Sequence, residues 1–321
     1  MVFVLLLFVA STVCVAAVHQ FHSHTPYFDS NTNGLWAGRQ WFTGVNVRTG
    51  IPVPLHDVEK FSTLIKKSGI RYIFVRTGTL LPSGAIPQPP SQLFFELQRQ
   101  NPDSIYLPWL SGDRRQLPLS SGAWRKEFIG ELGKLTDRGI FGIHLNIEPV
   151  SSDDMGYLNL LRDIRLVFGK SFFISHATRP AGPYGVSFGS MKHHLWSQEF
   201  YKSTMRYADQ SVVMAYNTRL TFELPYMAFV AHQTGLLLDW SCSVTGHRVL
   251  IGIPSYEHAP KYSDPHTENI RTASLGVRYA LSRKKKVECF DGVSIYSNWT
   301  TDPNEWSDYK NYWVGNLTPR N

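Results

Sequence analysis

The sequence predicts a single-domain α/β protein with the (β/α)8 architecture of a TIM barrel. Short runs rich in β-branched and aromatic residues alternate with amphipathic stretches along the 321 residues. Eight such pairs can be placed, which is the number that this barrel requires. The strand runs are apolar, as parallel strands covered on both faces must be. A doubly wound open sheet would also alternate, but no Gly-x-Gly-x-x-Gly follows the first expected strand.

The first residues predict a signal peptide over residues 1–17, which leaves the barrel domain over residues 18–321. Residues 2–18 are almost wholly apolar, and Val15-Ala16-Ala17 is a small-residue cleavage site. A positively charged start is missing, and a retained N-terminal anchor is the alternative. No later segment approaches the length of apolar chain that spans a bilayer. We therefore expect a secreted, extracellular protein with no membrane span in the mature chain.

The elements follow in order along the chain, each bounded by Gly, Pro or polar turn residues. The expected strands are residues 41–47, 71–76, 104–110, 140–147, 171–177, 211–216, 248–254 and 292–297. The helices that follow them are expected over residues 57–68, 90–100, 123–138, 153–168, 196–207, 225–239, 265–282 and 303–313. Several of these helices carry Pro near the start, where its missing N–H costs nothing.

Composition and motifs exclude several classes of function. The net charge of +7 is modest, and the basic run over residues 283–286 is interpreted as the solvated end of a helix. No zinc-finger, helix-turn-helix or RNA-binding motif accompanies it, so we expect no nucleic-acid partner. The Gly-x-Ser-x-Gly motif and Walker-type phosphate loops are absent. Aromatic residues make up 13% of the chain, which favours contact with flat apolar faces such as sugar rings.

Covalent features are expected at a few positions. Cys14 falls in the expected signal peptide, and the remaining Cys242 and Cys289 either pair in a disulfide or stay as two buried thiols. Asn298 and Asn316 each begin a glycosylation sequon. Asn316, in an exposed tail, is the expected acceptor, because Asn298 closes a strand. We expect a monomer with no metal or organic cofactor.

The fourth expected strand carries the strongest signal of chemistry. In a barrel of this type, active sites lie at the C-terminal ends of the strands. His144, Asn146 and Glu148 alternate with three apolar residues, so these polar side chains share the face that points into the barrel. Such groups are costly unless they bond to one another or to a ligand. Glu148 comes last, just before Pro149, where a catalytic acid belongs. Polar and aromatic residues at the other strand ends are Asn46, Arg76, Trp109, His176, Tyr216, Asn217, Glu257 and Trp299.

This spacing resembles glycoside hydrolase family 18, the chitinases and their relatives. That family carries Asp-x-x-Asp-x-Asp-x-Glu on the fourth strand of a (β/α)8 barrel. Glu148 matches the final Glu, and Asn146 and His144 stand at the two preceding Asp positions, with Phe141 at the first. The run Met214-Ala215-Tyr216-Asn217 resembles the family's Met-x-Tyr-Asp. Trp299 ends the eighth expected strand, where such enzymes carry a Trp under the sugar.

The resemblance implies hydrolysis of a β-linked amino-sugar glycan, an oligosaccharide or polysaccharide. Glu148 would act as the general acid on the leaving oxygen, while Asn146, Tyr216 and Asn217 would hold the acetamido group or a ring hydroxyl. In the family, the acetamido group is the nucleophile, and the Asp two residues before the acid stabilises the developing positive charge. Asn146 is neutral, and the loss of such an electrostatic partner can cost on the order of 3 kcal/mol.

Further residues are candidates for substrate contact. His176, at the end of the fifth expected strand, is either a paired histidine of the core or a contact for Glu148 or a sugar hydroxyl. Trp109, at the end of the third, is either a core side chain or a ring that stacks on a sugar, and His144 could meet a sugar from the inward face of the fourth. Glu257 follows the seventh expected strand and is either a loop residue paired with a cation or a second carboxylate. Paired carboxylates about 5 Å apart imply a retaining glycosidase, and pairs about 6.5 to 9.5 Å apart an inverting one.

Three functions therefore compete. The leading one is a secreted glycosidase that uses Glu148 as its acid. A non-catalytic carbohydrate-binding barrel, similar to a lectin, is the rival from another class, because the acid is kept while its charged helper is lost. The third is a two-carboxylate glycosidase that uses Glu148 and Glu257.

Overall fold

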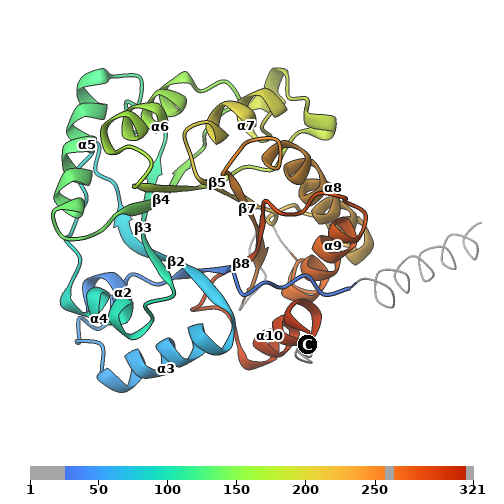
Figure 1. The fold of residues 1–321 in the computed structure, drawn as a ribbon, viewed down its shortest axis with the longest axis horizontal. Coiled ribbons are helices and arrows are strands. Elements are labelled where there is room, and N and C mark those ends of the chain that lie inside the picture. Colours follow the sequence, from blue (N-terminus) through green and yellow to red (C-terminus); the bar gives the residue numbers. More distant parts are fainter. Residues whose placement is uncertain (1–25, 257–263, 316–321) are drawn as a thin grey trace, which may run out of the picture.

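The computed structural model of the chain, which describes residues 26–256 and 264–315, is a closed barrel of eight parallel strands inside a ring of helices (Figure 1). Each strand pairs with its neighbours in chain order, and β8 closes the barrel against β1. The strands are β1 Asn33–Ala37, β2 Ile70–Thr79, β3 Ile105–Asp113, β4 Gly142–Glu148, β5 Phe173–Thr178, β6 Gln210–Met214, β7 Arg248–Pro254 and β8 Phe290–Tyr296. The predicted TIM barrel is confirmed.

The helices lie on the outside of the barrel, and several begin at a polar side chain that accepts a hydrogen bond from the first turn. Ser121, Asp154, Ser197, Asn269 and Asp302 cap their helices in this way. The α-helices are α2 Gln40–Thr43, α3 Leu55–Lys67, α4 Gln92–Gln100, α5 Gly122–Thr136, α6 Met155–Phe168, α7 Gln198–Met205, α8 Glu223–Ser241, α9 Ile270–Ser282 and α10 Pro303–Asp308. Short 3-10 turns η1 Pro183–Gly185 and η2 Gly189–His193 follow β5, and the short π-helix η3 Tyr309–Val314 follows α10.

The core has two layers, as both faces of the strands are covered. The larger layer lies between the strands and the helices and contains, among others, Ile143, Leu145 and Ile147 of β4. The smaller layer fills the barrel interior with mostly large side chains, namely Trp36, Tyr72, Phe74, Leu107, Trp109, Val212 and Leu250. These side chains fill the barrel interior below its mouth, so the space that the barrel offers to a ligand lies above them.

The strand expected over residues 41–47 is wrong. The first strand is β1, eight residues earlier at its start, and residues 40–43 form the short helix α2. Trp41 of α2 stacks on Phe61 of α3 with ring centroids 4.3 Å apart, and Phe42 meets Phe94 of α4 at 5.2 Å. The aromatic run therefore seals helices against each other. Asn46 consequently lies in the turn after α2 and not at a strand end.

The other seven expected strands each overlap an observed one. β2 and β3 run farther than expected, from residue 76 to 79 and from residue 110 to 113. This extension brings Thr79, Ser111 and Asp113 to the mouth of the barrel. The expected signal peptide, Glu257 and the sequon at Asn316 lie outside the described residues. Within the described ranges, no helix is both long and apolar enough to cross a membrane.

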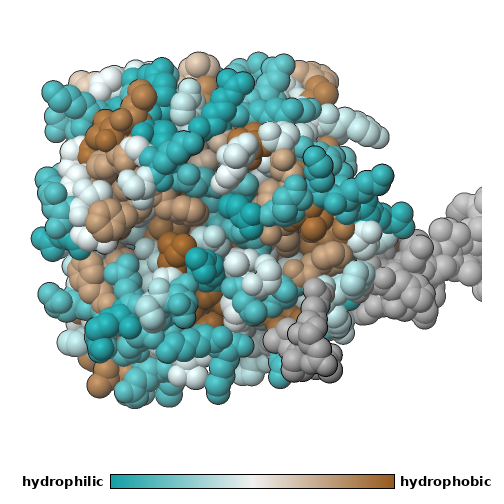
Figure 2. Space-filling model, in the orientation of Figure 1, coloured by the Kyte–Doolittle hydropathy of each residue, from teal (hydrophilic) through white to brown (hydrophobic). Residues whose placement is uncertain are grey.

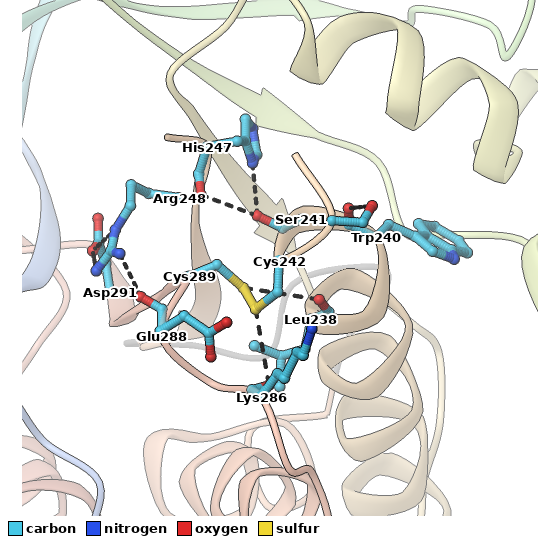
Figure 3. Close-up of a disulfide and its surroundings, with 11 residues drawn as sticks. Leu238, Trp240, Ser241, Cys242, His247, Arg248, Lys286, Glu288, Cys289 and Asp291 are labelled. Carbon is cyan, nitrogen blue, oxygen red and sulfur yellow. Dashed lines mark hydrogen bonds and ion pairs between the residues drawn. A yellow bond between two sulfur atoms is a disulfide. The ribbon is translucent and has the colours of Figure 1, made fainter. Parts of the chain in front are cut away.

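A disulfide joins Cys242, just after α8, to Cys289, just before β8 (Figure 3). The two Cα atoms lie 5.1 Å apart and are separated by 47 positions in the chain. Of the two alternatives for these cysteines, the structure therefore contains the disulfide and not the two free thiols. The bridge fixes the end of the long helix α8 to the strand that closes the barrel.

Candidate functional site

The end of β4 carries the site. Its side chains alternate as the sequence predicts: Ile143, Leu145 and Ile147 pack toward the helices, whereas Asn146 and Glu148 face a hollow at the mouth of the barrel. The hollow has a volume of about 510 Å³ and lies at the C-terminal ends of β2 to β5. Its lining residues are Thr79, Ser111, Gly112, Asp113, Arg115, Asn146, Glu148, Pro149 and Arg179.

Glu148 is exposed to solvent but is crowded by the walls of the hollow. This crowding raises the pKa of its carboxyl, and the Arg179 guanidinium at the end of β5 opposes the rise. Burial disfavours the charged form of an acid, while a nearby cation favours it. Because solvent still reaches the carboxyl, we expect the rise in pKa to be limited. A carboxyl with a raised pKa keeps its proton at higher pH, which is the property a general acid needs.

Asn146 lies two residues before Glu148, is half-buried, and lines the same hollow. Its Oδ1 atom is buried and accepts no hydrogen bond within the described chain. A buried acceptor without a partner is uncommon in proteins and calls for a ligand or a water. The neighbouring strand position, Ser111, donates its hydroxyl to Gly78 at 3.1 Å and leaves this amide oxygen unpaired.

His144 takes the third polar position of β4 but lies below the mouth, with no exposed surface. One ring nitrogen accepts from the Trp36 indole at 3.2 Å, and the other lies 2.9 Å from the Ser175 hydroxyl. The ring also stacks on Phe74 at 3.9 Å. Burial lowers the pKa of His144 well below its usual value, so the ring is neutral. The expected sugar contact is therefore replaced by a fully paired place in the barrel interior.

His176 lies on the other side of the sheet from the position expected for it. It pairs in register with Leu145, which faces the helices, and it has no exposed surface. Its ring nitrogens lie 3.1 Å from the Tyr157 hydroxyl of α6 and 3.0 Å from the Ser211 hydroxyl of β6. Burial lowers its pKa to about 3. Of the two alternatives for His176, the structure therefore has the paired core histidine and not the contact with Glu148 or a sugar, because residues of opposite parity on a strand face opposite sides.

Aromatic rings form one side of the mouth. Trp299 is 40% exposed and stacks over the buried Trp109, with ring centroids 6.4 Å apart and planes 9° from parallel. Tyr296 of β8 meets Trp299 edge-on at 5.8 Å and stacks on Tyr216 at 5.3 Å. Trp109 is thus covered by Trp299, which presents the accessible ring face. Tyr296 was not among the residues expected from the sequence, although its place in the last strand before Trp299 could have indicated it.

Tyr216 lies two residues after the end of β6 and is almost fully buried beside Glu148. Burial raises its pKa well above the usual value, and the Tyr296 hydroxyl and the Glu148 carboxyl raise it further. The hydroxyl therefore stays protonated and lies within electrostatic reach of Glu148. A protonated phenol at this place can donate a hydrogen bond to a ligand.

Asn217 follows in a loop whose backbone is held by Glu268, a residue that sequence reasoning missed. The N–H of Asn217 donates to one carboxylate oxygen of Glu268 at 2.7 Å, and the N–H of Thr218 donates to the other at 2.7 Å. Asn217 has the left-handed backbone (φ 60°), and its side-chain oxygen accepts from the Tyr256 hydroxyl at 3.1 Å. It lines neither of the two hollows at the mouth, so the structure does not bring it to the hollow of Glu148.

A second and larger hollow, of about 880 Å³, adjoins the first at Thr79. Trp299 and Arg76 line it together with the residues around α2. Figure 2 shows this molecule in the orientation of Figure 1, with apolar side chains visible between hydrophilic ones near the centre of the face. No group of three His, Cys, Asp or Glu residues in the described chain is arranged to hold a metal ion.

Comparison with solved structures finds the same fold in carbohydrate-active enzymes. A family GH18 chitinase from Chromobacterium violaceum is 16% identical over 91% of this chain and 83% of its own, with a TM-score of 0.57. The spore cortex-lytic enzyme SleL of Bacillus cereus is 12% identical over 88% of this chain and 74% of its own, with a TM-score of 0.56. A fungal endo-β-N-acetylglucosaminidase from glycosyl hydrolase family 18 is 14% identical over 86% and 96%, with a TM-score of 0.55.

No family model matches the sequence, and no curated protein is similar to it in sequence. At these identities the likeness is one of fold. The resemblance read from the ends of the fourth, sixth and eighth strands thus agrees with the architecture of family 18 structures, from one end of the barrel to the other.

Proposed function

We propose that this chain is a divergent relative of glycoside hydrolase family 18 that binds a β-linked amino-sugar glycan and hydrolyses it with Glu148 as the general acid. The observation that carries the proposal is the pairing of Glu148 with the unpartnered Oδ1 atom of Asn146 in one hollow at the C-terminal end of β4. An acid and a free amide acceptor two residues apart are what a substrate with an acetamido group requires.

Each group has a role in this reaction. Glu148 donates its proton to the glycosidic oxygen as that bond breaks, and crowding in the hollow, which raises the pKa of its carboxyl, favours the protonated form that this step needs. The acetamido oxygen attacks the anomeric carbon as the glycosidic bond breaks, while Asn146 accepts a hydrogen bond from the acetamido N–H. Water then attacks the anomeric carbon, gives a proton to the Glu148 carboxylate and displaces the acetamido oxygen, which completes the hydrolysis. The protonated Tyr216 hydroxyl donates to the acetamido oxygen and orients it. The exposed face of Trp299 lies against the apolar face of a sugar ring.

The glycosidase is tested by replacing Glu148 with Gln and measuring the release of reducing ends from chito-oligosaccharides and peptidoglycan fragments. A glutamine keeps the shape but cannot donate the proton, so we expect turnover to fall by at least about a hundredfold. Glu127→Gln, the same change on the exposed outer face of α5, is the control and should leave turnover as it was. Equal turnover in the Glu148 variant and the wild type would remove Glu148 as the acid.

A carbohydrate-binding barrel without catalysis is the second candidate, and Asn146 favours it. An amide can bind an acetamido group, but it cannot stabilise the positive charge that develops in the transition state. Calorimetric binding of chito-oligosaccharides by the wild type, with no release of reducing ends after long incubation, would decide for binding alone.

The two-carboxylate glycosidase remains a separate proposal, since Glu257 lies outside the described residues. In that case Glu257→Gln would abolish the hydrolysis of substrates that lack an acetamido group. Activity confined to acetamido sugars, and unchanged in the Glu257 variant, would count against it.

A further inference from the structure

The larger hollow at the mouth has an unusual charge for a site next to an acid. Three arginines, Arg39, Arg48 and Arg76, line it together with Thr79 and Trp299, and no Asp or Glu is among its lining residues, all of which lie in the described chain. We call this set of five residues the arginine groove. Its charge is therefore positive, whereas the neighbouring hollow contains Glu148 and Asp113 as well as two arginines.

Several arginines elsewhere in the described chain are neutralised by carboxylates, in contrast to those of the groove. Arg125, Arg165 and Arg248 each form an ion pair with an aspartate, at 2.5 to 2.6 Å. In the described part of the chain, Arg39 and Arg76 form no such pair with a carboxylate. Unneutralised arginines gathered in a concave surface attract anionic ligands, because the walls of low dielectric constant focus their field.

Arg39 and Arg76 both lie against neighbouring groups in the wall of the groove. Arg76 is exposed at the end region of β2, with its guanidinium 5.6 Å from the centre of the Trp109 ring. Arg39 is half-buried, and its guanidinium lies beside Gly78, where a Cβ atom would come within 3.7 Å of Cζ. Its Nε is buried and donates to no partner within the described chain. Arginines placed in this way lose little side-chain entropy when they bind.

The arginine groove is continuous with the hollow of Glu148. Thr79 lines both. Tyr296, whose ring meets that of Trp299 at 5.8 Å, is within electrostatic reach of both Arg76 and Glu148, because burial raises the pKa of its hydroxyl, Arg76 lowers it and Glu148 raises it. A chain of sugars bound at Glu148 can therefore extend over Trp299 into the groove.

We propose that the arginine groove binds an anionic group, a carboxylate or a sulfate, on a sugar of an acidic glycan whose amino sugar lies at Glu148. The inference rests on the proposed function and names its class of substrate. Arginine guanidinium groups suit both anions, because their planar N–H pairs match two oxygens at once. The larger hollow offers one exposed indole face beside hydroxyl groups and the amides of Gln40 and Asn46, which fits a single sugar ring. Single-stranded nucleic acids use a row of aromatic platforms instead.

The test measures binding by calorimetry in the Glu148→Gln background, so that no ligand is consumed. The probes are a hyaluronan hexasaccharide, which carries carboxylates, a chondroitin 4-sulfate hexasaccharide, which also carries sulfates, and neutral chitohexaose. We expect at least one acidic probe to bind more tightly than chitohexaose. Arg76→Gln and Arg39→Gln should each weaken the binding of that acidic probe by about tenfold, as expected for a lost charge-assisted hydrogen bond. Binding of chitohexaose should stay within about twofold, since these side chains have no anion to meet there.

Arg138→Gln is the matched control, because it removes the same charge from an exposed residue between α5 and β4, at the opposite end of the barrel. It should leave binding of every probe unchanged, and thermal melting should show all variants folded. Arg76→Lys should restore part of the affinity and distinguish charge from packing.

The possible failures are distinct. If chitohexaose binds but the acidic probes bind no better, or if Arg76→Gln and Arg39→Gln weaken all probes equally, the acidic-glycan inference is overturned while the proposed function stands. If no probe binds and the wild type releases no reducing ends, both are overturned. Equal affinity for a single-stranded oligodeoxythymidylate, lost in the same variants, would overturn the glycan assignment in favour of a nucleic acid.

Discussion

At the scale of the residue, the central position is Asn146. The same amide that leaves an unpaired acceptor at the mouth also withholds the negative charge that a transition state of this type requires. A neutral residue there is compatible with binding and with slow hydrolysis. An aspartate, which differs from this asparagine by one side-chain atom, would supply the missing charge.

We expect Asn146→Asp to raise turnover by about tenfold or more, because the new carboxylate would stabilise the developing positive charge. It would also raise the pKa of Glu148, since a nearby negative charge disfavours a second one. A general acid with a higher pKa stays protonated to higher pH, so the alkaline limb of kcat/KM should move upward. A pH profile of reducing-end release measures both effects. Asp113→Asn, in the same hollow, changes charge in the opposite sense and serves as the comparison; lower turnover in the Asn146 variant would contradict the proposed role.

At the scale of the element, β4 and β5 show how alternation decides what a histidine does. His144 and His176 both lie close to strand ends and resemble each other in sequence context. The register pairs His176 with Leu145, so it faces α6, whereas His144 faces the barrel interior. Neither reaches the mouth, because His144 lies two inward-facing positions below Glu148 and His176 faces the helices. Polarity alone thus identified the strand but not the depth of each residue.

The disulfide between Cys242 and Cys289 also acts on elements, because it joins α8 to the closing strand (Figure 3). Its loop spans 47 positions, and in the chain-entropy model a crosslink of that length stabilises the fold by about 4 kcal/mol. We expect the double variant Cys242→Ala with Cys289→Ala to lose about that much free energy of unfolding in urea. The reducing agent dithiothreitol should lower the stability of the wild type but not of the variant. A wild type insensitive to reductant, with equal stability in the variant, would contradict this expectation.

At the scale of the whole molecule, a network of buried histidines makes the fold sensitive to acid. His176 bonds to Ser211, which also lies 3.1 Å from His247, and His247 in turn lies 2.8 Å from Ser241. Burial lowers the pKa of His176 and of His247 to about 3 each. The folded chain therefore stays neutral at these sites between about pH 6.5 and pH 3, while the unfolded chain takes up protons.

Because the unfolded chain takes up these protons first, the histidines stabilise the fold fully above about pH 6.5, and their contribution to the free energy of unfolding is lost as the pH falls. For one such histidine the loss reaches about 2 kcal/mol at pH 5. We expect His176→Gln to make the free energy of unfolding fall less steeply between pH 6.5 and pH 5, as measured by urea titrations at each pH.

His232→Gln, at an exposed histidine on α8, is the control and should keep the wild-type slope. Glu268 acts in the opposite direction. Burial raises the pKa of its carboxyl, so ionisation of this group lowers the stability of the fold as the pH rises. Comparison of the single variants cancels that contribution. An unchanged slope in the His176 variant would show that this histidine does not carry the acid sensitivity.

The sequence by itself determined the architecture and the strand that bears the site. The periodicity of hydrophobic residues and the number of strands can be read from local sequence. The strict alternation of polar and apolar residues in β4 predicted its two faces. The sequence pattern did not predict β1, because Asn33 and Gly34 are typical of a turn, and because the aromatic residues of α2 are typical of a strand. In both cases contacts between helices and strands, absent from any local pattern, decided the outcome.

Only the tertiary structure decided which residues share the mouth. Glu148 and Arg179 come from the ends of β4 and β5, Trp299 follows β8, and Arg39 lies just before α2, a helix that the sequence did not indicate. Closure of the barrel brings them together, and the depth of each ring of side chains separates Asn146 from His144. Such proximity depends on the register between strands far apart in the chain, and for this reason no spacing along the sequence could have predicted it.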